Sequence, residues 1–377
     1  MEPLFIDIQK DSLISALQLV LRAVPSNNLL PILAGIHIEV RASEIIFTAS
    51  NTKMTIQYRL TLDAPSLLIH RTGEIVVPAR HFFEVVRKLG EGMMTLEMKE
   101  GLDLTIVSSE SHIRFRGMDP QEFPSIHSKD DHYRAKLRIN NALLKSTIKQ
   151  VAIAASSSEA RPVLTGVLFN FNRDGLNLMA TDGIRLATRK IVIENDQDID
   201  ATFLIPAQNL VEITKLLKND TDTTEIVTYA NQVRFTSNDV QIESVLIEGE
   251  FPSLSNVIPT SYISEVLLET NRLLNAVECV SVLASERVIK IAATKNNLLL
   301  FSQTADVGDV QHQVPFAQMK GDDFNFSLNV KLLVEILRSI GGGEVRLRFS
   351  GKLSPIMLIP EHTDPSTIFI ITPVRTQ

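Results

Sequence analysis

Side chains capable of catalysis or metal binding are scattered along this sequence and form no catalytic or metal-ligating motif. The eight histidines stand in no HExxH or other metal-ligand spacing, and the single cysteine, Cys279, falls in a helix-periodic stretch without a base partner. Gly341, Gly342 and Gly343 lack the Lys-Ser/Thr pair of a phosphate-binding loop and are typical of a loop after a helix. The sequence contains no GxSxG turn and no carboxylate cluster for metal ions. We therefore expect a protein that is not an enzyme and needs no metal or cofactor.

Basic side chains are concentrated in stretches with helical periodicity. Six such stretches, at 8–24, 79–90, 141–155, 207–218, 270–284 and 331–340, carry a net charge of +7, whereas the whole chain carries −7. The basic residues in them are Lys10, Arg22, Arg80, Arg87, Lys88, Lys145, Lys149, Lys215, Lys218, Arg272, Lys331 and Arg338. Favourable placement at helix C-termini explains Lys88, Lys218 and Arg338, but not residues in early or middle turns.

This charge distribution indicates a polyanion as a partner if the six helices face one surface. Contact with phosphates is electrostatic and independent of base sequence, so duplex DNA would be bound without sequence preference. Tryptophan is absent and the helical stretches lack tyrosine, so no aromatic platform for stacking single-stranded bases is expected. The sequence also lacks a helix-turn-helix or zinc-finger pattern.

The elements that would position these residues are repeated three times. PILAGI (31–36) matches PVLTGV (162–167), and the same offset runs on from 38–50 to 169–181, in each case as a strand, a turn and a strand. A short strand followed by an amphipathic helix recurs at 75–89, 203–217 and 326–340. A glutamate recurs at one place in this block, as Glu84, Glu212 and Glu335, and we attribute it to the design of the helix.

Each repeat also opens with a strand and a helix. Strands are predicted at 4–8, 135–139 and 265–269, followed by helices at 11–24, 141–155 and 271–284, with N-caps among Asp11-Ser12, Asn140-Asn141 and Thr270-Asn271. EFPS closes the first two repeats. The sequence therefore predicts three α+β domains, at 1–127, 128–255 and 256–377.

Composition places the chain among globular proteins of several domains. It has 377 residues, 44% hydrophobic and 21% charged, and no apolar run approaches the roughly 20 residues that span a bilayer. The first residues include acids and no basic segment, which argues against a signal peptide. A single cysteine cannot form an internal disulfide, so we expect a cytoplasmic location. Because the chain lacks a long apolar run, we expect no membrane partner.

Four strings distributed over the chain resemble the bacterial β sliding clamp family. They are RPVLTGV (161–167), ATDGIRLA (180–187), EFPSLSNVIP (250–259) and PVRT (373–376). The resemblance covers the whole chain and implies a head-to-tail homodimer of three-domain subunits, with helices lining a ring and antiparallel sheets outside. Duplex DNA would pass through this ring. DNA polymerase, clamp loader and repair proteins would bind through short linear motifs.

The resemblance also implies particular site residues. The peptide-binding pocket would contain Leu164, Thr181, Gly183, Ile184, Arg185, Leu186, Pro252, Val257, Thr372, Pro373, Val374 and Arg375. The dimer interface would bring Ile113 and Phe115 against Val282 and Leu283 of the partner chain. The family commonly has His at the position of Ile184 and often a larger apolar residue at that of Thr372, so this chain could be a divergent second clamp.

Two alternatives remain open at this level. Taken without the resemblance, ATDGIRLA is a strand, an Asp-Gly turn and a strand with no binding role. The three repeats are also compatible with a scaffold that binds proteins and does not encircle DNA.

Overall fold

The structure, a computed structural model, describes residues 3–26, 30–62, 66–124, 133–193, 200–254, 257–316, 318–361 and 367–375. The chain divides into two compact units: unit 1 comprises Met1–Ala142 and Lys215–Leu246, and unit 2 comprises Leu143–Thr214 and Ile247–Gln377. Both units combine α-helices with antiparallel sheets, which confirms the predicted α+β class. The predicted domain boundaries at 127/128 and 255/256 lie outside the described residues and stay a prediction.

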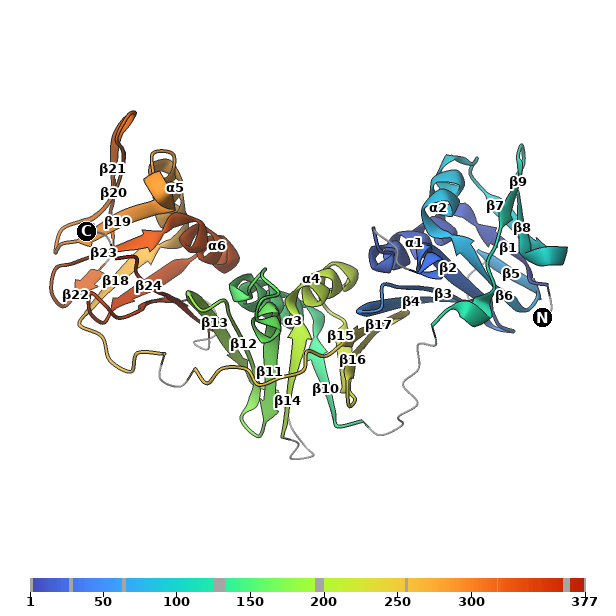
Figure 1. The fold of residues 1–377 in the computed structure, drawn as a ribbon, viewed down its shortest axis with the longest axis horizontal. Helices are drawn as coiled ribbons and strands as arrows, with labels where there is room; N and C mark the ends of the chain where they lie inside the picture. The colour runs from blue at the N-terminus through green and yellow to red at the C-terminus, as the bar shows by residue number, and fades with distance from the viewer. Residues whose placement is uncertain are drawn as a thin grey trace. The chain divides into compact units, whose positions relative to one another are not determined.

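Unit 1 contains two antiparallel sheets (Figure 1). The five-stranded sheet has the order β5 (Leu67–Arg71), β1 (Phe5–Gln9), β7 (Met93–Lys99), β8 (Asp103–Val107), β9 (His112–Arg116). The eight-stranded sheet has the order β10 (Ala135–Asn140), β15 (Thr223–Thr228), β16 (Gln232–Ser237), β17 (Val240–Val245), β4 (Met54–Thr61), β3 (Glu44–Ser50), β2 (Gly35–Val40), β6 (Gly73–Pro78). It is continuous because β4 of the first repeat pairs with β17 of the second.

Unit 2 also contains two antiparallel sheets. The nine-stranded sheet has the order β14 (Ala201–Pro206), β11 (Gly166–Asn172), β12 (Gly175–Thr181), β13 (Arg185–Ile191), β26 (Thr367–Ile371), β25 (Ile356–Pro360), β24 (Glu344–Phe349), β18 (Ser264–Glu269), β22 (Gln318–Lys320). The four-stranded sheet has the order β21 (Gly308–Val314), β20 (Leu298–Thr304), β19 (Val288–Ala293), β23 (Phe324–Asn329). Pairing of β13 with β26 joins the second repeat to the third, with Leu186 opposite Ile370.

One α-helix overlaps each of the six predicted helical stretches. The helices are α1 (Lys10–Val20), α2 (Ala79–Lys88), α3 (Asn141–Val151), α4 (Ala207–Leu216), α5 (Thr270–Ser281) and α6 (Val330–Ile340), and α6 begins one residue before its stretch. Helices α1 and α2 contact each other in unit 1, as do α5 and α6 in unit 2 (Figure 1). Each buries an apolar stripe at three- and four-residue spacing; in α1 it includes Leu13, Leu17 and Val20.

The predicted N-caps of α1 and α5 are wrong. Both helices begin one residue earlier, after Gln9 and Glu269, and neither of these residues makes a side-chain cap. The backbone N–H groups of Lys10 and Thr270 donate instead to the carbonyl oxygens of Gly92 and Gly343, at 3.0 and 2.9 Å. Since a distant loop satisfies this N–H at the start of each helix, the strand can lead directly into the helix.

A buried ionic network joins β18 to β24 in unit 2. The Glu265 side chain is 4% exposed and accepts hydrogen bonds from Arg346 and Arg348, at 2.5 and 2.7 Å. Arg346 also pairs with Glu361, and Arg348 lies over the Tyr262 ring. Burial of the Glu265 carboxyl opposes ionisation, but hydrogen bonds and charges from the two arginines outweigh this effect, so its pKa lies below the usual value.

Replacing Glu265 by Gln should lower the free energy of unfolding by about 3 kcal/mol at neutral pH, because two partly buried arginines lose a shared carboxylate. A pKa lowered by folding means that the carboxylate stabilises the fold above its unfolded pKa and loses this effect as the pH falls through the folded value. Urea unfolding at several pH values measures the difference. It should shrink in acid; a difference that is independent of pH would contradict this assignment.

Candidate peptide-binding surface and DNA-facing helices

The turn between β12 and β13 is held by its own polar groups. One carboxylate oxygen of Asp182 accepts hydrogen bonds from the backbone N–H groups of Ile184 and Arg185, both at 2.9 Å. The Thr181 hydroxyl donates to the Arg185 carbonyl at 2.6 Å and accepts from the Gly183 N–H at 3.1 Å. Gly183 has φ +91°, which glycine adopts without steric cost. This Asx-type turn leaves the Ile184 side chain 54% exposed.

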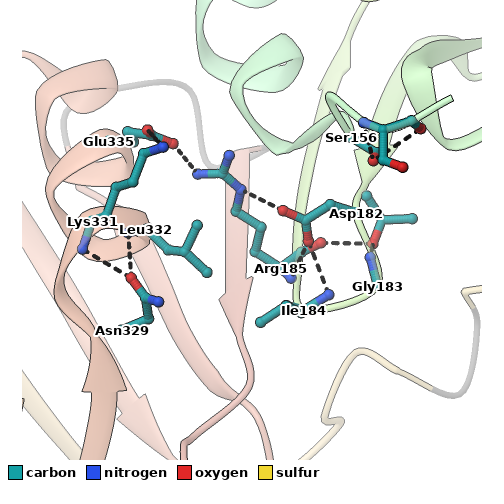
Figure 2. Close-up of polar contacts among 11 residues, drawn as sticks. Ser156, Asp182, Gly183, Ile184, Arg185, Asn329, Lys331, Leu332 and Glu335 are labelled. Carbon is teal, nitrogen blue, oxygen red and sulfur yellow. Dashed lines mark hydrogen bonds and ion pairs between the residues drawn. The ribbon is translucent and has the colours of Figure 1, made fainter. Parts of the chain in front are cut away.

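The Arg185 side chain lies between two carboxylates, as Figure 2 shows. Its Nε is 3.1 Å from Asp182 Oδ2, and its Nη1 is 2.5 Å from Oε2 of Glu335 in α6. Arg185 is 8% exposed. The guanidinium is therefore bound within the chain, and its predicted contact with a peptide stays a prediction.

The link between Arg185 and Glu335 is a contact that the sequence pattern did not reveal. The glutamate recurs in all three repeats, and nothing in the pattern distinguishes Glu335 from Glu84, which pairs with Arg87 of its own helix. The pattern records the position in the helix, whereas the partner depends on which strand lies beside that helix.

The C-terminal segment runs beside this turn. The Thr372 N–H donates to the Ile184 carbonyl at 2.9 Å, and the Val374 N–H donates to the Ser327 carbonyl of β23 at 2.8 Å. The side chains of Pro373 and Val374, in this hydrogen-bonded segment, are partly exposed. The structure thus brings Ile184 and the C-terminal residues together, as the resemblance implies.

An apolar cluster, the Leu186 cluster, lies on the sheet next to the turn. It consists of Leu186, Met357 and Ile370, with Leu254, Ile258, Ile359 and Ile368 packed against them. Among the other predicted pocket residues, Leu164 is buried, while Pro252, Val257 and Arg375 are exposed. The three central residues are buried, so the exposed Ile184 and the partly buried residues packed on the cluster are the apolar groups that a peptide side chain could contact.

Lys10 corrects the set of basic residues predicted to face DNA. It is 6% exposed, and its ammonium donates to the Leu89 carbonyl at 2.6 Å and pairs with Glu91 at 2.7 Å. Lys10 thus connects the first turn of α1 to the segment after α2, and its ammonium is not available to a phosphate. The prediction of Lys10 as a DNA-facing residue is wrong.

The other predicted basic residues lie at the surface. All are exposed except Lys145, which is partly buried. Arg87, Arg272 and Arg338 pair with Glu84, Glu269 and Glu278, and the arginines of these pairs are more than half exposed. Exposed pairs of this kind are weak and are readily exchanged for a phosphate.

The residues predicted for the dimer interface include exposed apolar groups. Val282, directly after α5, is 80% exposed, and Leu283 is partly exposed. Ile113 and Phe115 lie on β9, the edge strand of the five-stranded sheet, and Phe115 packs edge-on against the buried Phe82. The structure describes one chain, so the interface stays a prediction.

The described part of the chain contains neither a metal-binding cluster nor a membrane-spanning helix. No group of three or more His, Cys, Asp or Glu side chains in those ranges could hold a metal ion. Among the same residues, no helix is long and apolar enough to cross a membrane.

Comparison with known proteins gives matches along the whole chain. The family described as DNA polymerase III beta subunit matches in three parts: its N-terminal domain at residues 4–127, its central domain at 138–253 and its C-terminal domain at 255–375. The beta sliding clamp of Bacillus subtilis (strain 168) is 32% identical over 376 residues, covering 98% of this chain and 99% of that protein.

Solved structures show the same fold. The crystal structure of a DNA polymerase sliding clamp from Bacillus subtilis has a TM-score of 0.95 at 30% identity and covers 100% of both chains. The DNA polymerase III beta chain from Streptococcus pneumoniae TIGR4 has a TM-score of 0.94 at 28% identity, covering 99% of this chain and 100% of that one.

Three consecutive clamp domains of helices and antiparallel sheets define a DNA-clamp protein, a processivity factor and not an enzyme. The chain belongs to the family of bacterial DNA polymerase III beta subunits, the sliding clamps. The predicted resemblance is confirmed. The known role of a sliding clamp is to encircle DNA and tether its partners, so a scaffold that does not encircle DNA is not favoured.

Proposed function

We propose that this chain forms a head-to-tail homodimeric ring around duplex DNA in the cytoplasm, with domains bounded near residues 127 and 255. DNA polymerase, clamp loader and repair proteins dock short linear motifs on the surface formed by the β12–β13 turn and the C-terminal segment. The observation that supports docking is the exposed side chain of Ile184. The Ile184 carbonyl accepts a hydrogen bond from Thr372 of the C-terminal segment, and Leu186 of the Leu186 cluster follows two residues later in the chain.

Peptide binding at this surface depends on apolar anchors. Burying one side chain of Leu or Met size contributes roughly 1.5–3 kcal/mol, so two anchors give about micromolar affinity once the cost of ordering the peptide is subtracted. The exposed Ile184 side chain and the partly exposed Pro373 and Val374 supply the protein's half of these contacts. An extended peptide could place its apolar side chains on these residues and form hydrogen bonds with backbone groups of the C-terminal segment.

Ring formation is tested by retention on DNA. The full-length protein is loaded onto nicked circular DNA by its clamp loader, and the DNA is then linearised by a restriction enzyme. A ring slides off the free ends, whereas a protein bound to phosphates or to a DNA-bound partner remains. Equal retention before and after linearisation, measured by gel filtration, would exclude encirclement.

DNA contact is sequence-independent in this proposal, and its electrostatic part can be measured. Replacing Lys145 and Lys149 by Gln, or Lys215 and Lys218, should flatten the salt dependence of duplex binding by up to about one unit of slope per lost phosphate contact. The matched control replaces Lys295 and Lys352, exposed lysines outside the helices, with the same change in charge. Equal slopes for the helix and control variants, or a base-specific footprint, would contradict the proposal.

A further inference from the structure

We propose that Glu335 is a positioning residue for the peptide-binding surface. Through Arg185 it holds the β12–β13 turn, and with it the exposed Ile184, at a fixed place relative to α6 and the C-terminal segment. This inference rests on the proposed function of that surface and adds a residue that lies outside the predicted pocket.

Glu335 links the β12–β13 turn to α6 (Figure 2). Glu335 Oε2 accepts from Arg185 Nη1 at 2.5 Å, and Glu335 Oε1 is 4.0 Å from Lys331 Nζ one turn earlier on α6. The start of α6 is fixed by Asn329, whose side-chain oxygen accepts from the backbone N–H groups of Lys331 and Leu332, at 3.0 and 3.4 Å. Since Asn329 ends the strand to which Val374 is bonded, α6, the turn and the C-terminal segment are connected at this point.

The first repeat provides an internal comparison for the turn. There, one side-chain oxygen of Asn51 accepts from the backbone N–H groups of Lys53 and Met54, at 3.0 and 2.8 Å, and Thr52 has φ +72°. The Val245 N–H donates to the Lys53 carbonyl at 3.0 Å, just as Thr372 donates to Ile184. This equivalent turn has the same backbone bonds.

The first turn, however, lacks the aspartate and the arginine that link the second turn to Glu335. The repeat offset places Asn51 at the position of Asp182 and Met54 at that of Arg185, so the first turn forms with an amide and a buried methionine. The Asp182 carboxylate and the Arg185 guanidinium are therefore not needed to fold a turn of this type. What they add is a charged connection from the turn to α6.

The environment of the Arg185–Glu335 pair makes its attraction strong, and the pair can be broken without unfolding the turn. Arg185 is buried and the Glu335 side chain is 35% exposed, so water screens their attraction less than that of a surface pair. Without Glu335, the arginine keeps Asp182 at 3.1 Å as a counter-charge. Loss of Glu335 should thus leave the turn folded but less restrained relative to α6.

The test compares Glu335→Gln and Glu335→Asp with Glu84→Gln in the full-length protein. Glu84 is the matched control because it occupies the same place in the first repeat and makes an exposed pair with Arg87. Fluorescence anisotropy with a labelled peptide from the C-terminal tail of the replicative polymerase should show about fivefold weaker binding for Glu335→Gln, since a neutral acceptor makes a hydrogen bond to Arg185 roughly half as strong as a carboxylate does. Glu335→Asp, which keeps the charge, should recover part of the affinity, and Glu84→Gln should bind as the native chain does.

Hydrogen exchange supplies a readout that does not depend on the peptide. In Glu335→Gln, the amide of Thr372, bonded to Ile184, should exchange faster, while the amide of Val245, bonded to Lys53, should not change. If the native chain fails to bind the peptide, the proposed function is overturned, and exchange at Thr372 alone decides whether Glu335 positions the turn. Native exchange at Thr372 in Glu335→Gln, or equal losses of affinity in Glu335→Gln and Glu84→Gln, would overturn the inference.

Discussion

Deleting residues 373–377 should weaken binding of a labelled polymerase-tail peptide by more than tenfold while the chain stays folded and dimeric. Pro373 and Val374 are partly exposed and supply one side of the proposed site, and contact with one apolar anchor is worth roughly 1.5 kcal/mol or more, about a tenfold change in affinity. The core is spared because β26 ends at Ile371, and its pairing with β13 and β25 remains.

Fluorescence anisotropy measures the affinity, and circular dichroism with light scattering checks that the truncated chain is folded and dimeric. The single substitution Val374→Ala removes only part of the same wall and should give a smaller loss than the truncation. Unchanged affinity in a folded truncated chain would mean that partners dock elsewhere on the protein.

Replacing Val282 by Glu should convert the dimer to monomers at micromolar concentration. The Val282 side chain is 80% exposed in the single chain, so the substitution removes no core contact. A closed head-to-tail dimer contains the interface twice, so each substitution acts twice. Losing two buried valines costs about 3 kcal/mol, and burying two unpaired charges adds to this, so the dimer Kd should rise by at least about a hundredfold.

Val192→Glu is the matched control, because Val192 is 81% exposed and is not among the predicted interface residues. Sedimentation velocity should show monomers for Val282→Glu and dimers for Val192→Glu. Phe115→Ala combined with Leu283→Ala should also give monomers, but Phe115 contacts the buried Phe82, so that variant alters packing within the chain as well. A dimeric Val282→Glu would place the interface elsewhere.

The helices and the repeats could be predicted from the sequence because they depend on local patterns. Apolar residues at three- and four-residue spacing define an amphipathic helix wherever it is packed, and one overlaps each of the six predicted stretches. Helix ends are different, because their unpaired backbone groups can be satisfied from a distance. The carbonyl of Gly92 receives the first N–H of α1, and no local pattern around Lys10 records this partner.

The charge pattern was informative as a whole and misleading at one residue. Lys10 contributes to the excess of basic residues in the helices, yet its ammonium is bound to Leu89 and Glu91, about eighty positions along the chain. A count of charges includes every lysine equally, whereas only the fold decides which ammonium faces water. The prediction for the other residues still rests on the proposal that their helices face DNA.

The family and the α+β class could be read from the order of residues alone, since repeat spacing, periodicity and the four family strings are properties of the chain order. The way in which the proposed peptide-binding surface is held depends instead on contacts between distant parts of the chain. The pairing of β13 with β26 brings Arg185 to α6, where it meets Glu335, 150 residues further along the chain. The physical reason is that an ion pair depends on distance in space, and two strands from different repeats must align before the two charges come within reach of each other.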